Sequence, residues 1–146
     1  MSDDVELTSF PYPVPEYGAE AYWHACNEEY LVMQRCEDCN RLRWHPIPFC
    51  GDCGSGAFKW DRLTGKGTIN TWTVVTHPVH PAAIDKVPYV VAIIELDEQA
   101  GLTMVSNLID CDPDVIAIGQ RVSVKFVEHP HGQKIPVFRI IATSSP

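Results

Sequence analysis

The chain has 146 residues, of which 45% are hydrophobic and 21% charged, and its 19 aspartates and glutamates outnumber 11 lysines and arginines for a formal net charge of -8. This length suits one domain, or a small module joined to one. Nucleic acids and anionic membrane surfaces are bound mainly by clustered lysine and arginine, so an acidic chain without a basic block argues against both as partners.

The start of the chain and its apolar runs bear on its compartment. The longest apolar run, Tyr89 to Ile94, is far shorter than the roughly 18 residues of a membrane span. Met1 to Glu6 is acidic where a secretory signal peptide is basic. We therefore expect a cytoplasmic protein whose six cysteines do not form disulfides.

The acidic residues are concentrated near the N-terminus. Residues 1 to 34 contain seven acidic side chains and no lysine or arginine, residues 35 to 62 carry a net +1 (five basic against four acidic), and residues 63 to 146 a net -2 (six against eight). The first 18 residues also combine three prolines with Phe10, Tyr12 and Tyr17. Such an arm either stays loosely ordered or docks on a basic surface of a partner, and both interpretations remain open.

After this arm the apolar residues take a helical spacing. From Glu16 onward they recur every three or four positions, at Ala19, Tyr22, Trp23, Cys26 and Tyr30. This spacing predicts one amphipathic helix of about three turns. Residues 1 to 34 are thus interpreted as an acidic, proline-rich arm followed by a helix.

Four cysteines form two matched pairs. Cys36-Glu-Asp-Cys39 and Cys50-Gly-Asp-Cys53 each have a two-residue spacer, and ten residues separate the pairs. The spacer lets both sulfurs of a pair reach one ion, so two such pairs in a short segment strongly predict a four-thiolate metal site.

The chemistry of that site follows from its ligands. Asn40 and Gly54, which directly follow the two pairs, tolerate the left-handed backbone that a tight turn around a metal tends to require. Four cysteines close the coordination shell, so we expect one structural ion and not a catalytic one. Zinc is the default ion, although iron would also accept four thiolates.

Short strands are predicted on both sides of the cysteine pairs. They are residues 31–35, 41–44 and 59–63. Trp44, Phe49 and Trp60 are expected to cover the metal site, because so short a segment has few other apolar residues to bury. Residues 35 to 62 therefore form a zinc ribbon.

Five segments with the composition of strands follow the ribbon. They are residues 67–76, 89–96, 102–108, 122–126 and 137–141, with one longer connection at 109–120. Gly65 and Gly67 predict a bent or bulged entry to the first of them. The pattern fits a five-stranded Greek-key barrel of the OB type over residues 63 to 146. The expected fold class is therefore mostly β: an N-terminal helix, a zinc ribbon and an OB-fold barrel.

A few polar and aromatic side chains are candidates for ligand contacts. His77 and His80 lie in a loop of the kind that borders the ligand face of an OB barrel, where they could contact a phosphate or an acyl carbonyl. Trp72 could stack on an adenine, and Asn107 could reach a phosphate. Against this interpretation, exposed histidines are common, and a tryptophan on an alternating strand is more often a core residue.

Other residues are weaker candidates. Cys26 falls in the predicted helix and Cys111 lies between two aspartates, whose carboxylates disfavour the thiolate that a nucleophile needs. Lys125 and Arg139 are predicted on outward faces of strands and could also reach a phosphate. The sequence shows no evident set of nucleophile, base and orienting carboxylate, so no catalytic residue is assigned.

The order of all these features resembles one family. It is similar to the stand-alone OB-fold proteins with an N-terminal rubredoxin-like zinc ribbon, a domain of unknown function that is frequently encoded beside thiolase-like enzymes. The resemblance runs from about residue 19 to 141 and is carried by Tyr22-Trp23, residues 31–39, 41–44, Pro48, residues 50–55, 65–68, 72–75, 88–92, 95–97, 106–108, Gly119 and residues 136–139.

The resemblance implies an accessory subunit. Members of the family pair with thiolase-superfamily or lipid-transfer-type thiolase chains that make or cleave carbon–carbon bonds in acyl-CoA thioesters, and the catalytic residues belong to the partner. It implies a hetero-oligomer in which this chain stabilises the partner and helps to guide acyl-CoA at or near the interface. A free-standing acyl-CoA-binding module and a single-stranded nucleic-acid binder are the alternatives, and the charge distribution opposes the second.

Overall fold

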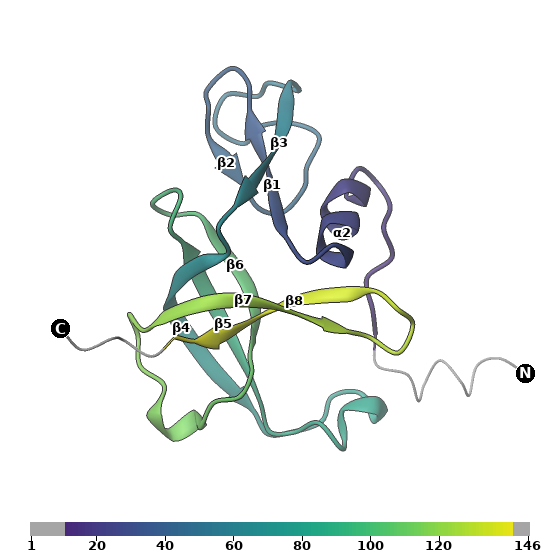
Figure 1. The fold of residues 1–146 in the computed structure, drawn as a ribbon, viewed down its shortest axis with the longest axis vertical. Helices are drawn as coiled ribbons and strands as arrows, with labels where there is room; N and C mark the ends of the chain where they lie inside the picture. The colour runs from purple at the N-terminus through teal and green to yellow at the C-terminus, as the bar shows by residue number, and fades with distance from the viewer. Residues whose placement is uncertain (1–10, 142–146) are drawn as a thin grey trace, which may run out of the picture.

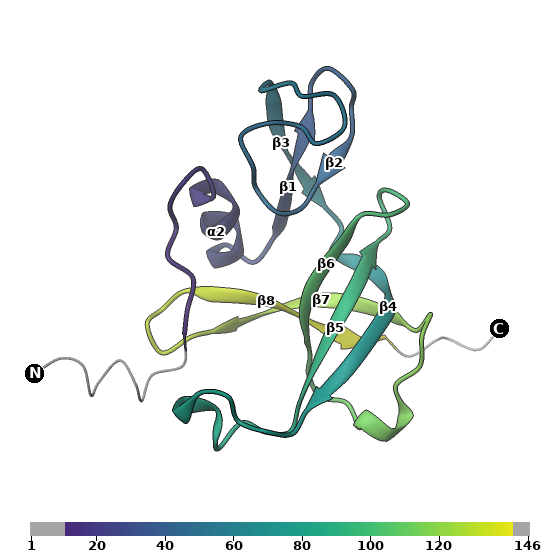
Figure 2. The same ribbon diagram turned by 180° about the vertical axis from the view of Figure 1, so that it is seen from behind.

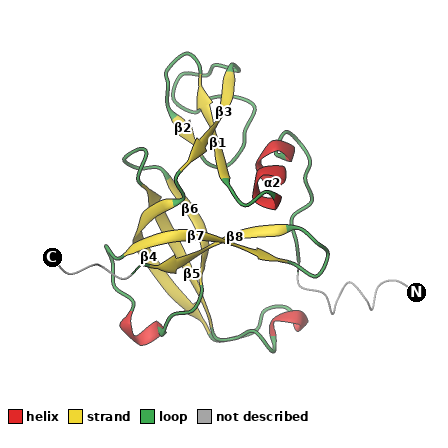
Figure 3. Ribbon diagram, viewed as in Figure 1, coloured by secondary structure: helices red, strands yellow, loops and turns green. Residues whose placement is uncertain are grey.

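The computed structural model describes residues 11–141 and consists mostly of strands, with one α-helix in that range. A three-stranded sheet stands above a closed barrel, and the helix lies beside that sheet and above the last hairpin of the barrel (Figures 1 and 3). The predicted fold class of helix, ribbon and five-stranded barrel is confirmed. In residues 11–141, no helix has the length and apolar character needed to cross a membrane.

The helix is shorter than predicted. It is α2, Glu20–Asn27, with Ala19 as its N-cap. It ends because Glu29 takes a positive φ of 64° and the N–H group of Tyr30 turns back to the carbonyl of Ala25 at 3.0 Å. Tyr30 therefore lies outside the helix, so the prediction of about three turns is wrong by roughly one turn.

The ribbon sheet consists of β1 (Leu31–Cys36), β2 (Leu42–Arg43) and β3 (Phe58–Leu63), in the order β2-β1-β3. Both pairings are antiparallel, and β1 pairs with β3 along its whole length. All three predicted strands are present, although the second is reduced to two residues. The segment of residues 37–41 that links β1 to β2 lies at the end of the ribbon that points away from the barrel (Figure 1).

The barrel has the order β4-β5-β6-β8-β7, and β7 pairs back with β4 to close it. Its strands are β4 (Lys66–Val75), β5 (Tyr89–Leu96), β6 (Thr103–Leu108), β7 (Arg121–Glu128) and β8 (Lys134–Ile140). The parallel contact of β6 with β8, at Leu108 and Phe138, joins the two halves of the Greek key. Figure 2 shows β4, β5 and β6 side by side on the opposite face from Figure 1.

The two glycines at the start of β4 allow close approach and do not form the predicted bulge. A Cβ atom on Gly67 would collide with the backbone oxygen of Glu95, and one on Gly65 would collide with Val124. The register shift of β4 against β5 instead falls between Ile69 and Thr71. The strand therefore has a register shift within it, past the entry where Gly65 and Gly67 predicted a bend or bulge.

Two long connections, not one, leave the barrel. Residues 109–120 link β6 to β7 as predicted and contain the short helix η2 (Pro113–Val115). Residues 76–88 link β4 to β5 and contain η1 (Pro81–Ala83). Both connections project from the end of the barrel opposite the ribbon (Figures 1 and 2).

Polar contacts tie the ribbon and the helix to the barrel. The side-chain amide of Gln99, in the β5–β6 turn, accepts from the N–H group of Leu42 and donates to its carbonyl, both at 2.9 Å. The carboxamide of Asn27, at the end of α2, accepts from the N–H group of Lys134 at 2.9 Å. These contacts fix both N-terminal elements against the barrel.

Replacing Gly67 with alanine should lower the free energy of unfolding by about 2–4 kcal/mol, because the added methyl group would meet backbone that cannot move without breaking the β4–β5 pairing. Urea unfolding followed by tryptophan fluorescence measures this loss. Gly51→Ala is the matched control, because its Cβ atom would meet nothing within 4 Å. Equal losses in the two variants would contradict the close-approach argument.

Candidate functional site

The structure brings the four predicted metal ligands together. Cys36 ends β1, Cys39 follows it in the next turn, and Cys50 and Cys53 lie in the loop between β2 and β3. The four Sγ atoms lie within 4.8 Å of one another, with 3.5 Å between Cys36 and Cys53 and 3.6 Å between Cys39 and Cys50. Tetrahedral coordination at a Zn–S distance of about 2.3 Å places sulfurs roughly 3.8 Å apart, so the cluster fits one such ion.

The two cysteine turns share one backbone geometry. The N–H group of Asn40 donates to the carbonyl of Cys36 at 3.0 Å, and that of Gly54 donates to Cys50 at 2.9 Å. Asn40 has a φ of 66° and Gly54 a φ of 78°. The left-handed conformation predicted for both residues is confirmed, and it lets each chain segment reverse around its pair of sulfurs.

The same turns favour the thiolate form of the first cysteine in each pair. The N–H group of Cys39 lowers the pKa of Cys36, and the N–H group of Cys53 lowers that of Cys50. A hydrogen bond to sulfur stabilises the negative charge, and the thiolate is the form that binds metal. The N–H groups of Arg41 and Ser55 act in the same direction on Cys39 and Cys53, but burial and hydrogen bonds with the neighbouring thiols outweigh them and raise the pKa of both.

The three aromatic residues expected to cover the metal site differ in burial, and the contacts of Trp44 and Trp60 are with the hydrophobic core. Trp44 and Trp60 are half-buried and pack against the hydrophobic core, and the indole N–H of Trp44 donates to the hydroxyl of Tyr22 at 3.3 Å. Phe49 is 63% exposed, so its predicted burial is wrong. The loop that carries Phe49 is held instead by main-chain hydrogen bonds in the turn around Cys50 and Cys53.

The two cysteines outside the cluster are poor nucleophiles. Cys26 is fully buried in α2, and burial raises its pKa to about 12. Burial also raises the pKa of Cys111, with further contributions from Asp110 and Asp112. The direction predicted for Cys111 is confirmed, although burial contributes more than the two carboxylates. Neither thiol is activated at neutral pH.

The four ligand candidates do not form one cluster. Nδ1 of His80 accepts from the N–H group of Ala82 at 3.1 Å and so caps η1, while His77 is exposed in the same connection. Trp72 is half-buried and packs against the core. Asn107 donates to the carbonyl of Val90 at 3.0 Å. His80 and Trp72 thus have structural roles, and ligand binding by any of the four stays a prediction.

Asn107 lines a groove on the barrel. The groove lies between the start of β5, the end of β6 and the β7–β8 hairpin, and its volume is about 350 Å³. Its walls are mostly apolar and include Tyr89, Leu108, Ile135 and Val137.

Sequence reasoning missed two residues of a second hollow. Lys66 and Ser123 line it together with Lys125 and Arg139, of which only the last two were identified as possible phosphate contacts. The missing signal is the register of β4 against β7, which places Lys66 directly opposite Ser123. Alternation along a single strand predicts which face a residue occupies, but it does not predict which strand lies beside it.

The arm of residues 1–18 is described only from residue 11, so Phe10 lies outside the described residues. Tyr12 stacks on His131, with ring centroids 4.3 Å apart, and lies 5.0 Å from His129. Both histidines belong to the hairpin between β7 and β8. This part of the arm therefore packs against its own barrel, and docking of the arm on a partner stays a prediction.

Two family descriptions match the sequence in succession. "ChsH2, rubredoxin-like zinc ribbon domain" matches residues 23–59, and "ChsH2, C-terminal OB-fold domain" matches residues 60–127. The boundary between them falls inside β3, where the ribbon leads into the barrel.

Several curated proteins are similar in sequence. A "DUF35 domain-containing scaffold protein" of Methanothermobacter thermautotrophicus is 35% identical over 71% of this chain and 77% of that protein. A "probable enoyl-CoA hydratase alpha subunit" of Thermomonospora curvata is 42% identical over 82% of this chain but only 36% of that protein. The "3-oxo-4,17-pregnadiene-20-carboxyl-CoA hydratase alpha subunit" of Mycobacterium tuberculosis is 28% identical over 89% of this chain and 40% of that protein. This chain thus spans little more than a third of the two hydratase subunits.

Two solved structures share the fold. A chain of the "Ltp2-ChsH2(DUF35) aldolase" is 36% identical and superposes with a TM-score of 0.78, covering 88% of this chain and 98% of that one. A DUF35 protein of unknown function from Sulfolobus solfataricus has a TM-score of 0.60 over 94% of this chain and 92% of that one, and at 11% identity it supports the fold alone. With its zinc-ribbon-like cysteine site and its closed five-stranded barrel, this chain belongs to the DUF35 family of OB-fold proteins with a rubredoxin-like zinc ribbon.

Proposed function

We propose that this protein is a non-catalytic, zinc-binding subunit of a cytoplasmic thiolase-superfamily complex that makes or cleaves carbon–carbon bonds in acyl-CoA thioesters. The observation that carries the proposal is the match to the DUF35 chain of an aldolase complex, at 36% identity over 98% of that chain. In this role the chain stabilises the partner and helps to guide the CoA substrate, while the partner supplies the catalytic residues.

The chemistry of the described residues supports a non-catalytic role. The cysteine cluster offers four protein ligands to one ion, which leaves no coordination position for water or substrate. The two remaining thiols have raised pKa values. The names of the hydratase subunits do not extend this proposal to hydration, because the match spans only 36% and 40% of those proteins.

The ion pairs formed by lysine and arginine side chains argue against single-stranded nucleic-acid binding. Among residues 11–141, several lysines and arginines form ion pairs: Arg35–Asp61, Arg41–Asp52, Arg121–Asp97, Lys134–Glu29 and Arg139–Asp110. A nucleic-acid groove needs unpaired cations along a path with stacking aromatics. The half-buried packing of Trp72 against the core also removes one stacking candidate.

The apolar groove beside Asn107 favours a second candidate, a free-standing acyl-CoA-binding module. The groove is large enough for part of an acyl chain or a pantetheine arm, at about 350 Å³. This function requires micromolar affinity of the isolated chain for an acyl-CoA, whereas the subunit function does not. Calorimetry on the isolated chain distinguishes the two.

Co-expression with the thiolase-like protein encoded beside it should give a stable hetero-oligomer, and only this complex should turn over acyl-CoA. Size-exclusion chromatography measures formation of the hetero-oligomer, and an assay for release or consumption of acyl-CoA measures turnover. A thiolase from an unrelated operon serves as the control for non-specific association. Turnover by the isolated chain, or failure to co-elute with any adjacent thiolase-like protein, would count against the proposal.

The ion is proposed to be a single structural zinc held by Cys36, Cys39, Cys50 and Cys53. The Cys36→Ser variant should lose the metal and the fold of the ribbon, because structural zinc contributes on the order of 10 kcal/mol to folding. Elemental analysis and circular dichroism before and after chelation measure the effect. Cys111→Ser is the matched control and should keep one zinc per chain. Full metal content in Cys36→Ser, or iron in the purified protein, would contradict the assignment.

A further inference from the structure

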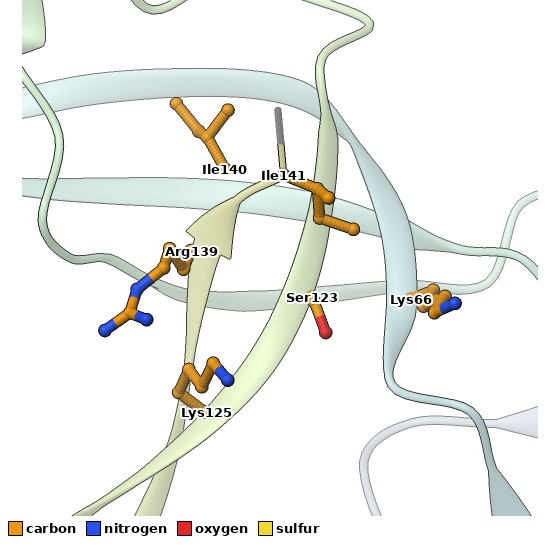
Figure 4. Close-up of a pocket in the computed structure, with 6 residues that line it drawn as sticks. All are labelled: Lys66, Ser123, Lys125, Arg139, Ile140 and Ile141. Carbon is orange, nitrogen blue, oxygen red and sulfur yellow. The ribbon is translucent and has the colours of Figure 1, made fainter. Parts of the chain in front are cut away.

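One face of the barrel gathers cations from three neighbouring strands. Lys66 of β4 pairs in register with Ser123 of β7, and Ser123 pairs with Arg139 of β8. Lys125 stands two residues beyond Ser123, so its side chain lies on the same face of β7. Figure 4 shows Ser123 between Lys66 on one side and Arg139 and Lys125 on the other.

These residues line a shallow hollow of about 410 Å³. Ile140 and Ile141 complete its wall. Three of the six basic residues of residues 63–146 line this hollow, although that part of the chain carries a net charge of -2. The hollow is thus a local concentration of positive charge on an acidic protein.

The carboxylates around the hollow neutralise only part of this charge. Arg139 forms an ion pair with Asp110 at 2.5 Å. Asp97 lies near Lys66, and its pKa is lowered mainly by hydrogen bonds from Arg121, with a smaller contribution from the charge of Lys66. Within residues 11–141, neither Lys66 nor Lys125 has a carboxylate oxygen within 4.0 Å. In that part of the chain, Lys66 and Lys125 therefore line the hollow without an ion pair.

Stability alone does not account for this arrangement. Lys125 lies diagonally from Lys66 and from Arg139 across the β4–β7 and β7–β8 pairs, so these like charges repel weakly and add nothing to the stability of the unliganded protein. Cations elsewhere on the barrel, such as Arg121, are matched with carboxylates at 2.6 Å. An anionic ligand would remove the repulsion at Lys66 and Lys125.

We propose that Lys66, Ser123, Lys125 and Arg139 form a binding site for the phosphate groups of a phosphate-bearing ligand. Lysine ammonium groups and a serine hydroxyl donate to the several oxygens of a phosphate, and Ile140 and Ile141 offer an apolar rim to the group attached to it. The cations form a compact cluster and not a stripe, which suits one ligand and not a polynucleotide. That the phosphates are those of a CoA thioester rests on the function proposed above.

The site is tested on the full-length, metal-loaded chain by NMR titration with CoA, dephospho-CoA, pantetheine and sodium phosphate at low ionic strength. CoA should shift the backbone amide signals of Ser123 and Lys125 with millimolar affinity, and pantetheine, which has no phosphate, should not. The double variant Lys66→Gln, Lys125→Gln should bind CoA roughly tenfold more weakly. Lys59→Gln, an exposed lysine of β3, is the matched control and should bind as tightly as the natural chain.

The remaining outcomes distinguish CoA from free phosphate as the ligand, and they distinguish failure of the phosphate site from failure of the proposed subunit function. Sodium phosphate that binds as tightly as CoA supports the site and assigns it to free phosphate. Unchanged CoA affinity in the double variant, or no response of the pocket amides to any phosphate, overturns the site. Loss of the thiolase-like partner with unchanged CoA binding also overturns it, because the cations would then contact the partner. A double variant that loses CoA binding and still co-elutes with the partner supports the site and leaves the subunit function standing.

Discussion

One continuous hydrophobic core holds the helix, the ribbon and the barrel together. It runs from Tyr22 and Cys26 of α2, through Leu31 and Met33 of β1, into Ile69 and the other inward residues of the barrel. A ribbon of this size has too little apolar surface to fold alone, so it shares the core of the larger barrel, and it carries the four-cysteine site at its far end. The orientation of the ribbon relative to the barrel therefore depends on packing that spans all three elements. That shared packing suits a rigid subunit that presents fixed surfaces to a partner.

Features that depend on a few neighbouring residues were predictable from the sequence. The cysteine turns are local, because the spacing of each pair and the residue after it determine the backbone reversal, and Asn40 and Gly54 adopt the predicted conformation. Alternation along a strand is a local signal of the same kind, as the buried Met104 and Leu108 on β6 show. The barrel type was predicted from five strand-like segments with a longer connection before the fourth.

Features that depend on pairing between distant segments were not predictable. The bulge in β4 is set by its register against β5, so it has no signal in the local spacing. The end of α2 is a local feature that was also missed, because glutamate carries no sequence signal for the positive φ that Glu29 adopts. The same limit applies to the candidate ligand residues. Asn107 was identified by its place on a strand, whereas the cation cluster exists only because β4, β7 and β8 meet with Lys66, Ser123 and Arg139 in one row.

The contact of Gln99 with Leu42 also determines which side of the ribbon sheet can accept another strand. The carboxamide of Gln99 hydrogen-bonds both the N–H group and the carbonyl of Leu42, as a peptide group of a neighbouring strand would. It therefore takes the place of such a strand at the outer edge of β2. An open strand edge invites pairing with other chains, and this side chain blocks it at the sheet's shortest strand. β3 is the other edge of the sheet order β2-β1-β3. Any addition to this sheet through backbone hydrogen bonds is therefore directed to β3.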